Sequence, residues 1–534
     1  MTTDEVTITC PEWQWLAVMT VLLVGLATIP VVVVWQTTPE THVFSGFLVN
    51  ARDGHSYLAK MRQGYEGAWQ YTLAYTAEDT EGLFAFPLYL GLGHVARLIP
   101  LPLIVYFTVG RLLGGAVLLV MSYVFVAHLT TEVNTRRWMW LVMSAGGGVG
   151  LLAVVLGFES VDLYVPEGYS YFGMLTNPHF PVTQALTLAI MLLVFAWPGL
   201  ADGWRVALLV VMSLFVAVTA PFGVATLWPL LAAGVGYRWW QGRARGWWAA
   251  IPWREGMRVA VVVGSMGVVG LYMVWTLNTN PAVAEWSRQN QILSPGVEEY
   301  VFGFGLLLPL AAVGIWWWRG ERGVWFWGLV TWLAMTLLLL YAPVSLQRRM
   351  MSGVQIAVGP LAGMGVAAVL GWLKQPLVRL LALAGLALGL FNTALFLTLL
   401  LSLGAQQQPL EPLTFYTQDE RAALDWLAEN TASDDVVLSS VTFGNFVPAY
   451  SAARVVYGHP LEVIRGEEKL RWVEGYFAGT LGEDDLRALL DGQGVDYVVW
   501  GPREQALQGS GPGPDLGGFA PVFENMTVTI YAIP

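Results

Sequence analysis

The side chains able to do chemistry lie in a few short stretches between long apolar ones. The first stretch, LVNARDGHSYLAKMRQGYEGAW (48–69), places Asp53 and His55 soon after the first apolar segment. A carboxylate at this position can take a proton from an acceptor hydroxyl group. It can equally be an ordinary solvated loop carboxylate, and position alone favours that second interpretation.

A second stretch, YAPVSLQRRMMSGVQ (341–355), contains Arg348 and Arg349 in a joint of a few residues between two apolar segments. Guanidinium groups suit a phosphate or pyrophosphate, which they bind by paired hydrogen bonds. An arginine pair that reaches lipid headgroups would have the same sequence, so both interpretations stay open.

Arg111 lies inside the apolar run IVYFTVGRLLGGAVLLV (104–120). An ionisable residue in a spanning segment is costly and usually faces a polar cavity or a partner, unless the span begins close to it. Two later loops hold further polar candidates: Glu159, Asp162, Glu167, Asn177 and His179, and Glu285, Arg288, Gln289 and Asn290. No spacing among them matches a metal site, and Asp53 with His55 supply too few ligands, so we assign no metal or other cofactor.

Composition predicts what surrounds these residues. The chain has 534 residues, is 56% hydrophobic and 12% charged, and contains 26 Trp and 58 Gly, which is too apolar for a soluble protein of this size. We therefore expect a multi-pass protein of the cell membrane, in contact with membrane lipids and not with nucleic acid.

About eleven apolar runs have the length of a membrane span, taking about 20 residues per crossing. They are 13–35, 101–128, 138–157, 181–199, 203–220, 222–239, 257–278, 300–318, 324–342, 351–372 and 379–403. Residues 238–258 hold five arginines, which predicts a cytoplasmic loop. With eleven crossings the N-terminus is then cytoplasmic and the tail extracytoplasmic.

Three loops on the predicted outer side are long: 36–100, 158–180 and 279–299. The run GLFAFPLYLGLGHVARLIP (82–100) is short for a span and is interrupted by proline and glycine, which favours a helix lying in the membrane interface. These loops have room to build a site.

The tail differs in composition from the rest. Residues 410–534 carry 19 acidic and 7 basic side chains, a net charge of −12, against +1 for residues 1–409. Helical patterns at 417–430 and 482–494 alternate with β-rich runs at 435–440 and 495–500, which predicts a small α/β domain. We expect a transmembrane domain at 1–404, a linker at 405–413 and the soluble domain at 414–534, with YGHP (457–460) and WGP (500–502) as turns.

This pattern resembles the GT-C superfamily of membrane glycosyltransferases, which includes protein mannosyltransferases and the lipid A aminoarabinose transferase. The resemblance rests on a carboxylate shortly after the first span (Asp53 in ARDGHSYLAKMRQG), the proline-opened run FPLYLGLGHVARL, Arg111 in the second span, long outer loops and an outer domain at the end. Two departures are Gly54 beside Asp53, where many relatives have paired acidic residues, and Pro87, Leu88 and Tyr89 in place of a PPL motif.

The resemblance implies an all-α polytopic membrane domain followed by an α/β domain, and a reaction on the outer face. A sugar would pass from a polyprenyl phosphate or pyrophosphate to an acceptor that is a lipid, a glycan or a protein. Asp53 would be the catalytic base, and Arg348 and Arg349 would stabilise the departing phosphate. The expected substrate-binding residues are His55, Arg111, Glu167, His179, Arg288, Arg348 and Arg349.

Two other classes of function remain as alternatives. A transporter or lipid flippase predicts internal repeats and discontinuous helices around charges at mid-membrane, and the sequence shows no repeat. A non-enzymatic membrane scaffold would use the acidic outer domain to bind a partner and would tolerate substitution of Asp53.

Overall fold

The computed structural model describes residues 6–197, 200–318, 323–407 and 412–534, so residues 408–411 of the predicted linker lie outside it. The chain forms two compact units, each assembled from separate stretches of sequence. Unit 1 comprises Met1–Pro30, Val109–Met273 and Ile292–Leu401, and unit 2 comprises Val31–Thr108, Val274–Gln291 and Ser402–Pro534.

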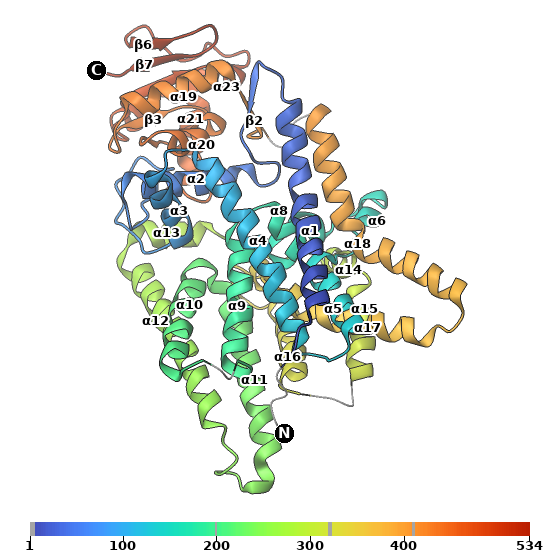
Figure 1. Ribbon diagram of the computed structural model, residues 1–534. Helices are drawn as coiled ribbons and strands as arrows, with labels where there is room; N and C mark the ends of the chain where they lie inside the picture. The colour runs from blue at the N-terminus through green and yellow to red at the C-terminus, as the bar shows by residue number, and fades with distance from the viewer. Residues whose placement is uncertain (1–5, 198–199, 319–322, 408–411) are drawn as a thin grey trace. The chain divides into compact units, whose positions relative to one another are not determined.

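Unit 1 is helical in its described residues (Figure 1). Four long helices have residues in both units: α1 (Cys10–Thr37), α4 (Leu103–Ala127), α12 (Trp253–Thr279) and α18 (Pro376–Gln407). The elements wholly within unit 1 are α5 (Val133–Ala145), α6 (Gly150–Val155), α7 (Val161–Tyr164), η1 (Pro166–Gly168), α8 (Ser170–Leu175), α9 (His179–Phe195), α10 (Asp202–Thr219), η2 (Pro221–Gly223), α11 (Val224–Gly242), η3 (Arg243–Arg245), α14 (Val297–Phe304), α15 (Leu307–Trp317), α16 (Val324–Leu339), η5 (Arg348–Met351) and α17 (Val354–Trp372).

The centre of unit 1 is α17, which packs closely against α5 and α15. Small residues on α17 make this possible. A Cβ at Gly363 would lie 2.4 Å from the Met139 Cα of α5, and one at Gly365 would lie 2.0 Å from the Leu310 carbonyl oxygen of α15. Close backbone approach through glycine is a common way for helices to associate in a bilayer.

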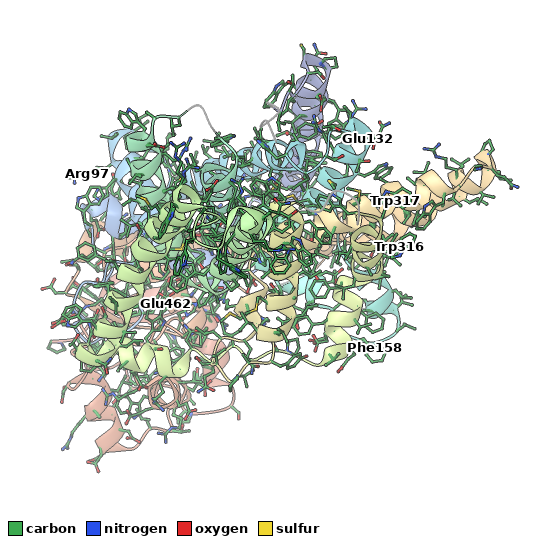
Figure 2. All side chains as sticks on the ribbon, turned by 90° about the horizontal axis from the view of Figure 1, so that it is seen from below. Arg97, Glu132, Phe158, Trp316, Trp317 and Glu462 are labelled. Atoms are coloured by element: carbon green, nitrogen blue, oxygen red, sulfur yellow. The ribbon has the colours of Figure 1, made fainter. Side chains whose placement is uncertain are left out.

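Six helices in the described part of the chain are long and apolar enough to cross a membrane: Cys10–Thr37, Leu103–Ala127, Asp202–Thr219, Trp253–Thr279, Val354–Trp372 and Pro376–Leu403. The pair α14 and α15, bent by 64°, makes a seventh if it is one broken span, and α9 and α16 are apolar but shorter. The chain is therefore a multi-pass membrane protein. Trp316 and Trp317 at the end of α15 lie with their rings 6.4 Å apart, beside Trp372 at the end of α17, a placement typical of the membrane interface (Figure 2).

Unit 2 contains a five-stranded sheet in the order β4-β3-β5-β7-β6. The neighbours β4, β3 and β5 are parallel, whereas β7 runs antiparallel to both β5 and β6. The strands of the larger sheet are β3 (Val436–Leu438), β4 (Arg454–Val455), β5 (Tyr497–Trp500), β6 (Ala520–Glu524) and β7 (Thr529–Ala532); its helices are α19 (Gln418–Asn430), α20 (Val441–Tyr450), α21 (Gly466–Ala478), α22 (Glu483–Leu490) and α23 (Pro502–Gln508).

The first loop and the tail share this unit. β1 (His42–Phe44) pairs antiparallel with β2 (Phe415–Thr417), and α2 (Ala51–Glu66) packs against both α3 (Pro87–Leu98) and α20. One hydrophobic core joins Leu58 and Tyr75 of the first loop to Phe443 and Phe446 of α20. The helix α13 (Pro281–Gln289) completes the unit.

The predicted fold class is confirmed: a mostly helical membrane region and a small α/β region at the C-terminus. Within the described residues, every predicted apolar run falls on a helix, although 138–157 and 300–318 each fall on two. The second break lies at Gly305, whose φ of 44° favours glycine. The count of eleven crossings, the orientation of the chain and the domain boundaries at 404 and 414 stay predictions.

Candidate functional site

Asp53 lies in the first turn of α2. This helix begins after Asn50, whose backbone adopts the left-handed conformation with φ 52°. A carboxylate in the first turn interacts favourably with the helix dipole. The Asp53 side chain is 40% exposed, so its carboxylate is accessible from solvent.

His459 of the tail contacts the Asp53 carboxylate, with Nε2 3.2 Å from Oδ1. The His459 side chain is buried, and the backbone N–H of Leu461 donates to its Nδ1 at 3.2 Å. Because Nδ1 acts as an acceptor, the proton of the neutral ring is on Nε2. His459 therefore donates a hydrogen bond to Asp53.

A buried ion pair lies next to this contact. Lys60 Nζ is 2.8 Å and 3.0 Å from the two carboxylate oxygens of Glu462, which also accept hydrogen bonds from Ser56 and Tyr71 at 2.6 Å each. Burial acts to raise the pKa of Glu462, but the Lys60 charge and the hydrogen bonds lower it to about 2. Burial lowers the pKa of Lys60, and Glu462 opposes this effect. The pair holds α2 and residues 459–462 together.

His55 is fully buried between aromatic rings. Its ring centroid lies 5.1 Å from that of Phe47 and 4.7 Å from that of Phe446, both edge to face. Burial lowers the pKa of His55 to about 3, so the ring is neutral at physiological pH. His55 packs in the core behind the surface that presents Asp53.

In unit 1 the structure brings two of the predicted residues together. Arg349, in the 3-10 helix η5, lies with Nη1 3.2 Å from Oε1 of Glu167, in η1. The Glu167 side chain is buried and that of Arg349 is 25% exposed. The backbone N–H of Gly353 also donates to the Glu167 carbonyl, at 3.0 Å. This ion pair anchors the QRR stretch to the loop at 158–180.

Arg348 is placed differently from its neighbour. Its guanidinium carbon lies 5.6 Å from the centroid of the Tyr164 ring, and its buried Nε has no hydrogen-bond partner among the described residues. The Tyr164 hydroxyl is held by Glu299 at 2.6 Å. Nor does any carboxylate in the described ranges form an ion pair with Arg348. Arg348 thus offers a cation with unused hydrogen-bond donors.

The other predicted binding residues, Arg111, His179 and Arg288, differ in burial and in their partners. Arg111 is buried and donates from Nη1 to the carbonyl oxygens of Met174 and Leu175 at 2.9 and 3.2 Å, where it caps the end of α8. His179 begins α9 and is buried. Arg288 is exposed and pairs with Glu285 within α13, at 2.7 Å. Asp53, His55 and Arg288 belong to unit 2, and Arg111, Glu167, His179, Arg348 and Arg349 belong to unit 1.

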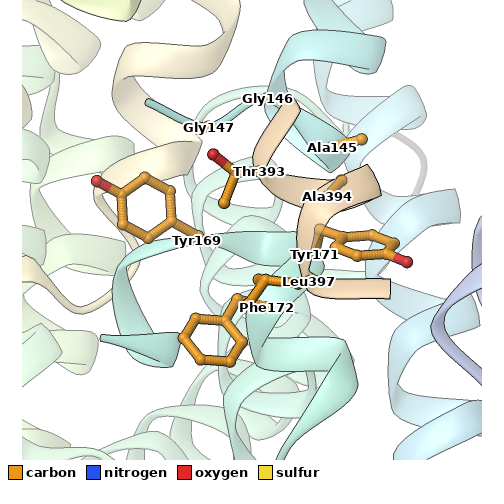
Figure 3. A pocket seen from close by; sticks show the side chains of 9 residues that line it. All are labelled: Ala145, Gly146, Gly147, Tyr169, Tyr171, Phe172, Thr393, Ala394 and Leu397. Atoms are coloured by element: carbon orange, nitrogen blue, oxygen red, sulfur yellow. The ribbon is translucent and has the colours of Figure 1, made fainter. Parts of the chain in front are cut away.

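Unit 1 also encloses a small pocket (Figure 3). Its free volume of about 10 Å³ is the space of about one water. The hydroxyl of Tyr169 donates to the Gly303 carbonyl and that of Tyr171 pairs with Thr398, each at 2.6 Å. We assign no substrate to this pocket, which is lined by Ala145, Gly146, Gly147, Tyr169, Tyr171, Phe172, Thr393, Ala394 and Leu397.

In the parts of the chain that the structure describes, no three His, Cys, Asp or Glu side chains are grouped so that they could hold a metal ion. Asp53 and His459 are a pair, and the His459 Nδ1 is already occupied by the Leu461 N–H. We assign no catalytic step to a metal ion.

His459, Lys60 and Glu462 were not among the residues predicted from the sequence. The sequence predicts a turn at YGHP, and His459 lies between β4 and α21, but its side chain points back to α2. One signal was present: Ser56 and Lys60 follow Asp53 by three and seven residues, which places all three on one face of a helix.

No protein-family model matches the sequence, and no curated protein matches it. Several solved structures match the fold. The oligosaccharyltransferase of Archaeoglobus fulgidus in the apo form has a TM-score of 0.55 and 13% identity, covering 92% of this chain and 70% of its own. ArnT from Cupriavidus metallidurans in the apo state has a TM-score of 0.50 and 13% identity, covering 97% of this chain and 98% of its own.

The archaeal enzyme has also been solved with an inhibitory peptide and a dolichol-phosphate, and that structure has a TM-score of 0.50 and 13% identity, covering 90% of this chain and 69% of its own. At this level of identity the likeness is one of fold. The chain has the GT-C fold, as its sequence predicted.

Proposed function

We propose that the chain is an integral membrane glycosyltransferase that moves a sugar from a polyprenyl phosphate or pyrophosphate to an acceptor on the outer face of the membrane. The observation that carries the proposal is the Asp53 carboxylate. In a chain with the GT-C fold it lies in the first turn of a helix, is 40% exposed and accepts a hydrogen bond from a buried histidine. A solvent-accessible and oriented carboxylate is suited to act as a general base.

The reaction assigns one role to Asp53. Its carboxylate takes the proton from the acceptor group as the acceptor atom attacks the anomeric carbon of the sugar. The bond between that carbon and the phosphate oxygen breaks, and the phosphate leaves with the electron pair. The acceptor is a lipid, a glycan or a protein.

A separate role falls to Arg348, which binds the donor phosphate. Support comes from its unpaired buried Nε, from its stacking on Tyr164, and from the lack of a carboxylate partner among the described residues. Arg349 provides a second guanidinium, oriented by Glu167. The fold relative from Archaeoglobus fulgidus binds a dolichol-phosphate, which is a ligand of the same chemical class.

The remaining predicted residues take supporting roles in the proposal. Arg288 is exposed and free of the core, so it is retained as a contact for the acceptor or the donor. His179, Glu167 and His55 are buried side chains. Arg111 is also buried, and it donates a hydrogen bond to the Met174 carbonyl. None of these four needs to touch the sugar.

Transfer is measured with the purified chain in liposomes, supplied with a panel of synthetic polyprenyl-phosphate hexoses and pentoses labelled in the sugar, and with membrane extract as the acceptor source. We expect labelled product with the wild type, and a loss of about 100- to 10,000-fold with Asp53→Asn, as for removal of a general base. The matched control is Glu66→Gln, at the other end of the same helix, whose partner is Arg62. Equal transfer by wild type and Asp53→Asn would sink the assignment of the base, and lipid movement without covalent product would favour a flippase.

The role of Arg348 has its own readout. Arg348→Gln should weaken the binding of the lipid donor by about 10- to 100-fold, since a hydrogen bond to a charged group contributes about 1.5–3 kcal/mol. Arg348→Lys should be intermediate, because it keeps the charge and loses the planar fork. Arg243→Gln, an exposed arginine that stacks on Trp240, serves as the control. Unchanged donor affinity in Arg348→Gln contradicts the phosphate role and leaves that of Asp53 untouched.

A further inference from the structure

The tail of this chain carries no assigned function, yet it places one side chain on Asp53. We propose that His459 is a positioning residue for Asp53. Residues 459–462 of the tail then contribute to the site by orienting the Asp53 carboxylate. This inference rests on the proposed function, because it concerns the carboxylate that the proposal makes the base.

Two successive contacts join the tail segment to one face of α2. His459 meets Asp53, and three residues later Glu462 meets Ser56 and Lys60. Positions separated by three and seven residues lie on the same side of a helix. Residues 459–462 therefore run along the face of α2 that carries Asp53, Ser56 and Lys60. The contact between His459 and Asp53 is one of the contacts along this face.

The second contact fixes the first. Both Glu462 oxygens are held by Lys60, and the Glu462 backbone N–H donates to the His459 carbonyl at 3.2 Å. The side chain of Lys60 is fully buried, with its ammonium 4.4 Å from the centroid of the Phe86 ring. Because these groups are out of solvent, the segment cannot shift along α2 without leaving a buried charge unpaired. The His459 ring is thus held at a set place over the carboxylate.

The hydrogen bonds of the His459 ring determine how it acts on the Asp53 carboxylate. With the Leu461 N–H donating to Nδ1, the ring donates from Nε2 to Asp53 Oδ1. It limits rotation of a carboxylate that is otherwise 40% exposed, and so favours one orientation toward the acceptor. Misplacing a reacting group by about 1 Å can cost about 100-fold in rate.

Three substitutions at His459 separate this role from a structural one. His459→Gln keeps an N–H donor near the position of Nε2. His459→Asn keeps an acceptor for the Leu461 N–H near the position of Nδ1 but is too short to reach Asp53. His459→Leu removes both. His94→Asn is the control, since His94 belongs to the same unit, stacks on Trp69 and has no contact with Asp53.

We measure kcat and KM for the labelled lipid donor, together with the midpoint of thermal unfolding of each variant. The expected result is a fall in kcat of about 10- to 100-fold in His459→Asn and His459→Leu, with the donor KM within about threefold of wild type, and recovery to within a few-fold in His459→Gln. The double variant Asp53→Asn/His459→Asn should be no slower than Asp53→Asn, because His459 acts through Asp53.

Two outcomes overturn the inference. One is a wild-type kcat in His459→Asn while Asp53→Asn is inactive, which leaves the proposed function standing. The other is a loss in His459→Gln as large as that in His459→Leu, in proteins that unfold at the wild-type temperature. Full activity of Asp53→Asn, by contrast, is a failure of the proposed base itself.

Discussion

Lys60 Nζ lies 2.8 Å from Glu462 Oε1, across 402 residues of sequence, and the exposed fractions of the two side chains are 0% and 10%. A buried pair of this kind contributes little net stability, because the desolvation of both charges offsets much of their attraction. Its effect is instead to fix which residues of the tail face α2.

Removing one partner should therefore be severe. We expect Lys60→Met or Glu462→Gln to lower the free energy of unfolding by about 3–5 kcal/mol, since each leaves a charge buried without its counterion. Combining both changes should cost clearly less than the sum of the two. The measurement is thermal unfolding of the purified protein in detergent.

Arg487→Gln is the control for that experiment, because it removes an exposed pair with Glu483, 3.9 Å apart at side-chain exposures of 74% and 91%. Such pairs contribute about 0–1 kcal/mol. Additive losses in the Lys60 and Glu462 double variant would show that the two charges do not depend on each other.

Two glycines of α3 offer a second test, of the packing that supports α2. A Cβ at Gly93 would lie 2.0 Å from the Met61 carbonyl oxygen, whereas one at Gly91 would meet nothing within 4 Å. Gly93→Ala should destabilise the protein by about 1–3 kcal/mol through overpacking. Gly91→Ala should be neutral or stabilising by up to about 1 kcal/mol, because alanine is the better helix former. Unfolding midpoints compare the two directly, and equal midpoints would contradict the close approach of α2 and α3.

Much of the fold follows from local patterns. Long apolar runs predict helices, and the helical pattern predicted at 417–430 falls on α19, which begins with a capping box formed by Thr417 and Glu420. The glycine run 146–148 and Gly305 explain why two apolar runs are split, a detail that hydrophobicity alone does not reveal.

The candidate site is less predictable. Asp53, Glu167, Arg348 and Arg349 stood out because charges are rare in this chain, and the structure pairs Arg349 with Glu167. His459 did not stand out, since its role depends on a contact made across 406 residues. Contacts of that length come from tertiary packing and leave no period or motif in a single sequence. The same reason hid the core that the first loop shares with the tail.

His55 gives a pH dependence whose sign can be worked out. Burial lowers its pKa from about 6.5 to about 3, so between these values the unfolded chain binds a proton that the folded chain does not. Stability should therefore fall as pH falls below about 6.5, by at most about 1.4 kcal/mol per pH unit. Replacing His55 by Leu removes this dependence, so the wild type should lose about 1.4 kcal/mol more than His55→Leu between pH 7.5 and 5.5.

Unfolding of each protein at the two pH values tests this. The quantity compared is the change in unfolding free energy with pH, so the effect of altered packing at position 55, which is the same at both pH values, cancels. His42→Leu is the control variant, because it replaces an exposed histidine by the same residue. Parallel slopes for wild type and His55→Leu would mean that the buried ring is not a source of the pH dependence.

The orientation of the chain can be tested through its single cysteine. Cys10 is exposed and begins α1, and the predicted topology places it in the cytoplasm. A membrane-impermeant maleimide should therefore leave Cys10 unlabelled in intact spheroplasts and label it once the membrane is opened. The complementary variant Cys10→Ser/Met526→Cys carries its only thiol in the tail, at a residue that is 91% exposed, and should be labelled in intact spheroplasts. Labelling of Cys10 without permeabilisation would reverse the topology, and would place Asp53 and the tail on the side of the membrane opposite to that required by an extracytoplasmic acceptor.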